Sequence, residues 1–203
     1  MIGMKYQCTV CSKYHDSISG AVACKEECLK TKDSRNVVDV YKYWKTDAIK
    51  AALNQKRHNF SILITNHFHD FNIGSVIRNS NAFLGKKIYV LGHRKYDVRG
   101  TVGTHHYENI EHITSVEDIM NKGFHLVGFD DLPEAKPLDS FVWPQDKHIV
   151  MCFGQETVGL TKDVVTKCDD IVYIRQYGSV RSLNVGCASA IAMFSYCQQV
   201  VGG

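Results

Sequence analysis

The stretch Gly178-Ser-Val-Arg-Ser-Leu-Asn-Val185 gathers glycine, serine and asparagine in a turn that leads directly into an apolar segment. Small residues continue through 186–190, and they allow the following helix to press closely against another backbone. Ser182 is the expected cap of this helix, since serine commonly accepts a hydrogen bond from the first backbone N–H groups. The composition is typical of a capped loop that holds a ligand at the start of a helix.

From residue 59 onward, short β-rich runs alternate with segments of helical periodicity. This alternation, with nearly continuous apolar strands, predicts an α/β fold in which a mostly parallel sheet has helices on both faces. In open sheets of this kind, ligands bind beyond the carboxyl ends of the strands. The expected strands are 61–65, 87–91, 125–129, 148–153 and 170–174, and the expected helices are 74–84, 115–122, 161–167 and 182–198.

Two more segments fall at such strand ends. In 70–78, Asn72 is expected to cap a helix and Arg78 to point away from the core. In 153–160, a buried strand breaks at Gly154 and Glu156 begins the next loop. Taken singly, these features are equally compatible with a surface arginine and a carboxylate that caps a helix or pairs with a neighbour. A dinucleotide site is disfavoured, because no Gly-x-Gly-x-x-Gly follows the first strand.

Together the three segments resemble the signature motifs of the SpoU (TrmH-like) family of SPOUT RNA methyltransferases. Asn-x-Gly-x-x-x-Arg stands here as 72–78, Gly-x-Glu-x-x-Gly-Leu as 154–160 and Gly-x-x-x-Ser-Leu-Asn-Val as 178–185. The segment 103–108 also looks like the loop after the second strand in relatives that act on tRNA. The resemblance implies a C-terminal deep trefoil knot and a homodimer.

By the same resemblance, the chain is expected to transfer the methyl group of S-adenosylmethionine to a ribose 2′-hydroxyl, in tRNA rather than rRNA. An rRNA substrate, or a non-catalytic RNA-binding scaffold that keeps the knotted fold, are the alternatives. Arg78 matches the family's catalytic arginine, and Asn72, Glu156, Ser182 and Asn184 match the residues that orient this arginine and the ribose. The expected cofactor site comprises Phe153, Gly154, Gly159, Ile174, Gly178 and Leu183.

One residue departs from the family pattern inside this expected cofactor site. Arg175 stands where the family usually has proline after the position of Ile174. The departure removes no catalytic group, but it bears on the local shape of the pocket.

Four of the eight cysteines lie within the first 28 residues. Cys8-x2-Cys11 and Cys24-x3-Cys28 form two pairs separated by twelve residues, a spacing compatible with one tetrahedral Zn²⁺ held by four thiolates. Unpaired thiols, or a site in which His15 replaces one cysteine, are the alternatives. The expected organisation is a zinc-binding element over 1–33, a helical linker over 34–57 and the methyltransferase domain over 58–203.

Charge and hydropathy limit the partners and the compartment. The formal net charge of +3 is too small to indicate a polyanionic partner by itself, although residues 93–99 combine basic side chains with a tyrosine that could contact RNA. No stretch approaches the roughly 18 apolar residues of a membrane span, and the start of the chain lacks a signal-peptide pattern. The sequence therefore predicts a cytoplasmic protein without a membrane partner.

Overall fold

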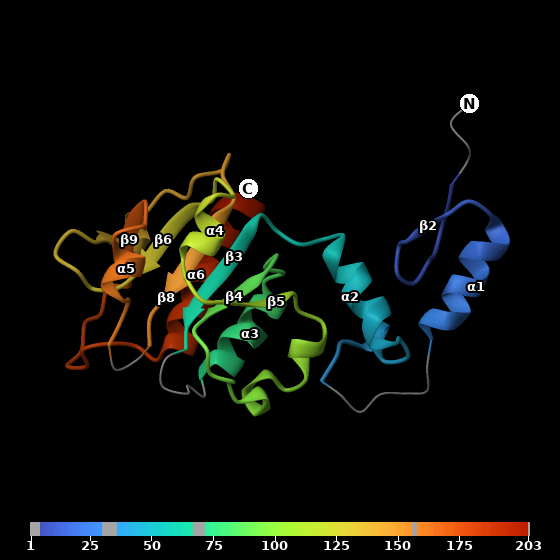
Figure 1. Cartoon of the computed structure of the whole chain (residues 1–203), viewed down its shortest axis with the longest axis horizontal. Coiled ribbons are helices and arrows are strands. Elements are labelled where there is room, and N and C mark those ends of the chain that lie inside the picture. The colour runs from blue at the N-terminus through green and yellow to red at the C-terminus, as the bar shows by residue number, and fades with distance from the viewer. Residues whose placement is uncertain (1–4, 30–35, 67–71, 156–157, 203) are drawn as a thin grey trace.

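A computed structural model describes residues 5–29, 36–66, 72–155 and 158–202 (Figure 1). Its main body is a seven-stranded sheet with strand order β5-β4-β3-β8-β6-β9-β7. All strand pairings recorded in this sheet among the described residues are parallel, which confirms the predicted fold class. The strands are β3 (Phe60–Thr65), β4 (Ile88–Leu91), β5 (Ile110–Ile113), β6 (His125–Phe129), β7 (Lys136–Pro137), β8 (Ile149–Phe153) and β9 (Asp170–Tyr173).

The central strands β3 and β8 are buried along their whole length, because helices cover both faces of the sheet. Successive side chains of a strand point to opposite faces. Ile62 and Ile64 of β3 accordingly join one core with α3 (Asn72–Ala82) and α6 (Val185–Tyr196). Leu63 joins a second core with α4 (Glu117–Met120) and α5 (Lys162–Val165) on the other face.

Helices α3 and α6 pack closely on one face of the sheet. A Cβ on Gly186 would lie 3.0 Å from the Cβ of Ser75, so a larger residue there would force the helices apart. The side-chain amide of Asn79 donates to the carbonyl oxygen of Gly186 at 2.7 Å and to the hydroxyl of Ser189 at 3.0 Å. The chain thus returns from β9 to the face that α3 covers, as the predicted knot requires.

The start of α6 differs from the prediction. The helix begins at Val185 and its cap is Asn184, whose side-chain oxygen accepts from the backbone N–H of Gly186 at 2.9 Å and of Cys187 at 3.4 Å. Ser182 lies two residues earlier and does not occupy the cap position. The expectation that Ser182 caps the helix was therefore wrong, although asparagine and serine are equally good caps.

At the N-terminus, β1 (Tyr6–Gln7) pairs antiparallel with β2 (Tyr14–His15) and is followed by α1 (Ile18–Cys28). Helix α2 (Thr46–Asn54) lies between this element and the sheet (Figure 1). Ala48 of α2 packs against the four-cysteine cluster, whereas Ile49 and Leu53 pack against Tyr107 of the main body. The division into 1–33, 34–57 and 58–203 stays a prediction, because residues 30–35 lie outside the described part of the chain.

A buried ion pair anchors the linker to the segment 103–108. The side chains of Arg57 and Glu108 are 3% and 0% exposed, and Arg57 Nη1 lies 2.7 Å from Glu108 Oε2. The amide of Asn81 in α3 donates to the other carboxylate oxygen of Glu108 at 2.7 Å. Glu108 therefore fixes this loop against α3. Removing either charge would leave the other buried without its partner, a loss of about 3–5 kcal/mol.

None of the described helices combines the length and the apolar character needed to cross a bilayer.

Candidate active site

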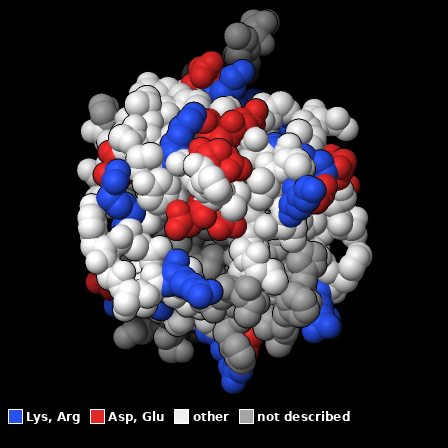
Figure 2. Space-filling model, turned by 90° about the vertical axis from the view of Figure 1, so that its left-hand side faces the viewer, with Lys and Arg blue, Asp and Glu red and all other residues white. Residues whose placement is uncertain are grey.

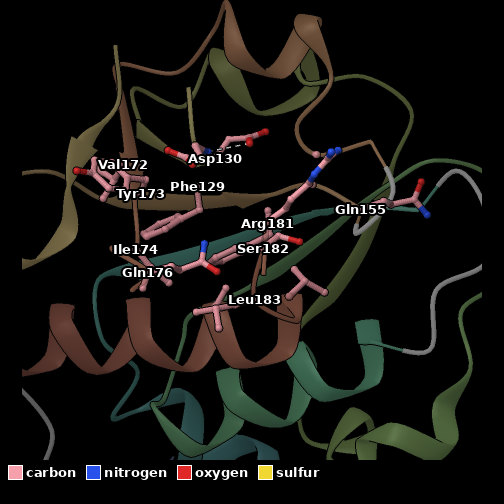
Figure 3. A pocket seen from close by; sticks show the side chains of 16 residues that line it. Phe129, Asp130, Gln155, Val172, Tyr173, Ile174, Gln176, Arg181, Ser182 and Leu183 are labelled. Atoms are coloured by element: carbon pink, nitrogen blue, oxygen red, sulfur yellow. Dashed lines mark hydrogen bonds between the residues drawn. The ribbon is translucent and has the colours of Figure 1, made fainter. Parts of the chain in front are cut away.

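Loops that follow β6, β8 and β9 surround an open cavity beside the first turn of α6 (Figure 3). The cavity has a volume of about 150 Å³ and is open to solvent. It lies at the carboxyl ends of parallel strands, where ligands bind in open α/β sheets. The lining residues are Phe129, Asp130, Asp131, Phe153, Gly154, Gln155, Gly159, Val172, Tyr173, Ile174, Gln176, Arg181, Ser182, Leu183, Val185 and Ala188.

The loop after β8 is shaped by two glycines that admit no side chain. A Cβ on Gly154 would lie 2.0 Å from the carbonyl carbon of Gly159, so the two backbone segments touch. Gly159 has φ +65°, a left-handed conformation that glycine adopts readily. The carboxylate of Asp130 accepts from the backbone N–H of Leu160 at 2.8 Å. Asp130, at the end of β6, therefore holds the loop that forms one wall of the cavity.

The third motif, residues 178–185, is hydrogen-bonded to the first motif, residues 72–78. The side-chain amide of Asn184 donates to the side-chain oxygen of Asn72 at 2.9 Å. Since the Asn184 oxygen also caps α6, this one side chain fixes the start of α6 to the start of α3. The structure thus brings together two residues that the sequence placed in different motifs.

Arg78 lies on the exposed side of α3. Gly74, one turn earlier, packs against loop 98–106, where a Cβ would come within 2.8 Å of Gly100 Cα. Ser75 and Asn79 face α6. Residues three or four apart share a helix face, so Arg78 projects between loop 98–106 and the N-terminal end of α6.

The remaining expected residues fall into three groups. Around the cavity lie Ser182 and five of the six expected cofactor residues, namely Phe153, Gly154, Gly159, Ile174 and Leu183. Gly178 is exposed and does not line the cavity. Glu156 lies outside the described residues. Arg175 is also absent from the lining; its Nε lies 3.4 Å from the carboxylate of Asp139.

Two glutamines that sequence reasoning missed contribute polar groups to the cavity wall. The side-chain oxygens of Gln155 and Gln176 are buried and have no hydrogen-bond partner among the described residues. Leaving a buried polar group unpaired costs about 1–3 kcal/mol. The Gln176 amide lies among the other lining side chains, whereas the Gln155 side chain points away from them (Figure 3). A polar ligand in the cavity could pair with Gln176 and remove that cost. A glutamine in a loop follows no periodic pattern, and so the sequence offered no signal for them.

The cavity has mixed charge. Asp130 and Asp131 contribute carboxylates and Arg181 contributes a guanidinium. Figure 2 shows acidic side chains gathered beside a hollow on the side of the molecule that carries β9 and α5, with basic side chains around them. This face is therefore not uniformly basic, as a surface that binds RNA through charge alone would be.

The sequence profile of the SpoU rRNA Methylase family matches residues 59–194, which contain all three motifs. The chain belongs to this family. It is 26% identical over 168 residues to the Bacillus subtilis protein named "Putative TrmH family tRNA/rRNA methyltransferase YacO", a match that covers 77% of this chain and 66% of that protein. The chain thus spans slightly less than two thirds of the length of this relative.

Solved structures of the SpoU family share the fold. AviRb from Streptomyces viridochromogenes, crystallised with the cofactor AdoMet, aligns with a TM-score of 0.64 and 26% identity over 72% of this chain and 60% of AviRb. The A. aeolicus TrmH/SpoU tRNA modifying enzyme aligns with a TM-score of 0.66 and 22% identity over 76% of this chain and 83% of that enzyme.

The SpoU match begins at residue 59, so the N-terminal cysteines lie outside it. The sulfur atoms of Cys8, Cys11, Cys24 and Cys28 all lie within 4.8 Å of one another. His15 does not belong to this group, which leaves a four-cysteine set as the arrangement that the structure supports.

Burial and crowding shift the thiol pKa values of the cysteine cluster in both directions. Burial, and next the neighbouring Cys11 side chain, raises the pKa of Cys24 to about 11. Burial would also raise the pKa of Cys8, but backbone N–H groups of Cys11 and Val10 donate to its sulfur and hold the pKa below its usual value. Crowded, partly desolvated sulfurs with backbone donors are a donor set that fits Zn²⁺.

Proposed function

We propose that this SpoU-family chain methylates RNA on a ribose 2′-hydroxyl, with S-adenosylmethionine as methyl donor. The observation that carries the proposal is the convergence of the motif segments, with residues 153–155, Gly159 and residues of 182–185 around one cavity and Asn184 bonded to Asn72 of the first motif. The names of relatives support RNA as the substrate, since YacO is named for tRNA and rRNA and the A. aeolicus protein for tRNA. Between these, tRNA is the proposed substrate.

The residues around the cavity fit an adenosine-bearing cofactor. Phe153, Ile174 and Leu183 supply apolar wall. Gly154 and Gly159 pack so closely against neighbouring atoms that no side chain could be added at either position. The buried amide oxygen of Gln176 has no partner among the described residues and can accept a hydrogen bond from the cofactor. When bound, S-adenosylmethionine supplies an electrophilic methyl group on a sulfonium.

Arg78 is the proposed catalytic residue. A guanidinium remains protonated at any physiological pH, so it is a poor general base. From its exposed position between loop 98–106 and α6, it would bind the phosphate next to the target ribose and stabilise negative charge that develops on the 2′-oxygen. The reaction forms an oxygen–methyl bond, breaks the sulfur–methyl bond and passes the hydroxyl proton to that phosphate or to water.

The polar residues near Arg78 have positioning roles in this proposal. Both side-chain polar atoms of Asn184 are engaged, one with Asn72 and one with the first turn of α6, so Asn184 acts by placing α3 against the cavity. Ser182 lines the cavity and can face the ribose. Glu156, whose position lies outside the described residues, keeps its proposed role of orienting Arg78. Correct placement of reacting groups is a large part of a rate enhancement.

Purified chain incubated with methyl-labelled S-adenosylmethionine and separate pools of tRNA and rRNA tests the proposal. After digestion to nucleosides, label is expected in 2′-O-methylnucleosides from tRNA. Label on a base, or no label in either pool, would contradict the proposed function, and label in rRNA alone would contradict the choice of tRNA. Mapping the methylated position in the labelled pool would then identify the nucleotide.

Two variants separate chemistry from cofactor binding. Arg78→Ala is expected to lower the methylation rate at least 100-fold, the usual loss when a charge-stabilising group is removed. Its affinity for S-adenosylmethionine, measured by calorimetry, should remain near that of wild type. Arg78→Lys keeps the charge but not the planar fork, so partial activity is expected. A chain that binds no cofactor at all would favour the RNA-binding scaffold instead.

The chain is also proposed to act as a homodimer, as the family resemblance implies. Exposed apolar side chains on α6, Ile191 at 40% and Phe194 at 54%, support a buried interface there. Light scattering after size exclusion should give twice the chain mass. Phe194→Glu should give the monomer mass, whereas Cys187→Ser on the same exposed side should not.

We further propose that Cys8, Cys11, Cys24 and Cys28 bind one structural Zn²⁺. Elemental analysis of purified chain should find about one zinc per chain, and Cys11→Ser should lose it. Cys187→Ser, which changes an exposed cysteine outside the cluster, is the matched control. Because Cys11→Ser could misfold, zinc release from wild type by a chelator provides a second measurement. Wild-type chain without zinc would refute this proposal.

A further inference from the structure

A second cavity opens at the amino ends of the strands, whereas the motif segments lie at the carboxyl ends. It has a volume of about 480 Å³ and is open to solvent. Most of its lining residues stand at or just before the amino ends of β3, β4, β5, β6 and β8. None of them belongs to a SpoU motif. The lining residues are Ser61, Lys86, Lys87, Tyr89, Asn109, Lys122, Phe124 and His148.

The charged residues that line this cavity are basic, and one carboxylate, that of Glu111, lies beside them. All charged side chains among its described lining residues are lysines, namely Lys86, Lys87 and Lys122. Lys87 is paired with Glu111 at 2.5 Å, which offsets one charge and leaves a positive excess. Concave surfaces lined by one sign of charge focus the electrostatic field and concentrate counter-ions. The cavity therefore favours an anionic ligand.

Tyr89 holds two of the lysines in place. Its ring is almost fully buried, and the ammonium groups of Lys122 and Lys87 lie 5.0 Å and 5.5 Å from the ring centroid. Lys122 Nζ also lies 3.4 Å from the Tyr89 hydroxyl. Cation–π contacts of this kind orient a cation without neutralising it. The ammonium groups are thus placed at the cavity while their charge remains available.

His148 contributes polarity without charge. Its Nδ1 lies 2.7 Å from the side-chain oxygen of Asn59, and its Nε2 lies 2.8 Å from the hydroxyl of Ser61. Burial, and next the charge of Lys86, lowers the pKa of His148 to about 4. The ring is therefore neutral at physiological pH.

We propose that this lysine pocket binds a phosphate group, supplied by the backbone of RNA. Ammonium groups bind phosphate as point charges. Asn109 holds the wall in place, because its side-chain amide donates to the side-chain oxygen of Asn54 at 2.9 Å and to the carbonyl oxygen of Lys86 at 3.2 Å. The aromatic wall of Phe124 suits a ribose or base attached to the phosphate. A free nucleotide carries the same group and is the other possible source. The choice of RNA as the source rests on the proposed function, whereas the phosphate pocket itself rests on the lysines that line it.

Fluorescence anisotropy of a labelled tRNA, titrated with the full chain in the absence of S-adenosylmethionine, tests the proposal. The double variant Lys86→Ala/Lys122→Ala should bind about tenfold more weakly at 0.1 M salt. Its plot of log affinity against log salt should be shallower by about one to two, because each lost phosphate contact changes the slope by about 0.7–0.9. Lys86→Arg/Lys122→Arg keeps both charges and should restore most of the affinity.

Lys162→Ala is the matched control, because it removes an exposed lysine of α5 that does not line this cavity. Thermal unfolding of each variant checks that the fold is retained. A parallel calorimetric titration with AMP identifies the source of the phosphate. If the alanine variant no longer binds AMP but keeps its RNA affinity, the pocket binds free nucleotides rather than RNA. If the alanine variant matches Lys162→Ala for both RNA and AMP, the phosphate pocket is refuted.

Discussion

The side-chain amide of Asn184 donates a hydrogen bond of 2.9 Å to the side-chain oxygen of Asn72, which lies 112 positions earlier in the chain. The same asparagine caps α6 through its oxygen. One residue thereby links two helices that flank the proposed methyl-transfer centre. The two roles can be separated by substitution, because serine also caps helices but is too short to reach Asn72.

The free energy of unfolding of Asn184→Ser is expected to lie within about 0.5 kcal/mol of the wild-type value, because the serine still caps the helix. Its methylation rate should nevertheless fall about tenfold, because α3 and its Arg78 lose their tie to α6. Asn184→Ala should lose the same activity and about 1 kcal/mol of stability besides. Denaturant titration and initial rates measure the two effects. Full activity of Asn184→Ser would show that the link to Asn72 has no positioning role.

Continuous apolar runs made the centre of the fold predictable. Strands β3 and β8 are buried on both faces, and their sequences give an unambiguous strand signal. Strand β5, Ile110-Glu-His-Ile113, was missed because a strand at the edge of the sheet carries polar residues. Strand β7 has only two residues, too few for any periodicity.

The sequence motifs predicted only those parts of the candidate site that the motifs themselves contain. Residues 153–155, Gly159 and residues of 182–185 line one cavity because they lie at or after the carboxyl ends of strands β8 and β9. The choice between Ser182 and Asn184 as helix cap depends on backbone angles that both residue types accept, so sequence alone could not make it. Gln155 and Gln176 became candidates only once their burial without partners was known.

Gly154 tests the shape of the cofactor wall. Gly154→Ala places a Cβ 2.0 Å from the backbone of Gly159, so the loop must move and the affinity for S-adenosylmethionine should fall more than tenfold. Gly178→Ala is the matched control, because a Cβ there meets no described atom within 4 Å. Calorimetry on both variants decides the matter. A loss of affinity in Gly178→Ala would instead support the expectation that Gly178 belongs to the cofactor site.

Replacing Gln176 should affect the stability of the free chain and its affinity for the cofactor in opposite directions. In the free chain its amide oxygen is buried and unpaired, so Gln176→Leu should leave the free energy of unfolding unchanged or raise it by up to about 1 kcal/mol. If the amide binds the cofactor, the same substitution should lower the affinity of the chain for S-adenosylmethionine about tenfold. Tyr177→Leu, which alters an exposed neighbour, should change neither quantity. A Gln176→Leu chain with wild-type cofactor affinity would exclude the amide from the site.

His148 predicts a measurable acid sensitivity of the fold. Its pKa is lowered from about 6.5 in an unfolded chain to about 4 in the folded chain, by burial and then by Lys86. Between these values the unfolded chain binds a proton that the folded chain does not, so stability falls as the pH drops from about 6.5 towards 4. Because the ring is only partly buried, the contribution at pH 5 should be about 1 kcal/mol rather than the full value of the shift.

Denaturant titrations at pH 7.5 and pH 5 of wild type and His148→Gln measure this contribution. The glutamine can still bond to Ser61 and Asn59 but does not titrate, so the variant should lose about 1 kcal/mol less than wild type between the two pH values. Carboxylates titrate equally in both chains and cancel in the difference. His93→Gln, at an exposed loop position, should retain the wild-type pH dependence. Equal losses in wild type and His148→Gln would mean that His148 is charged in the folded chain at pH 5.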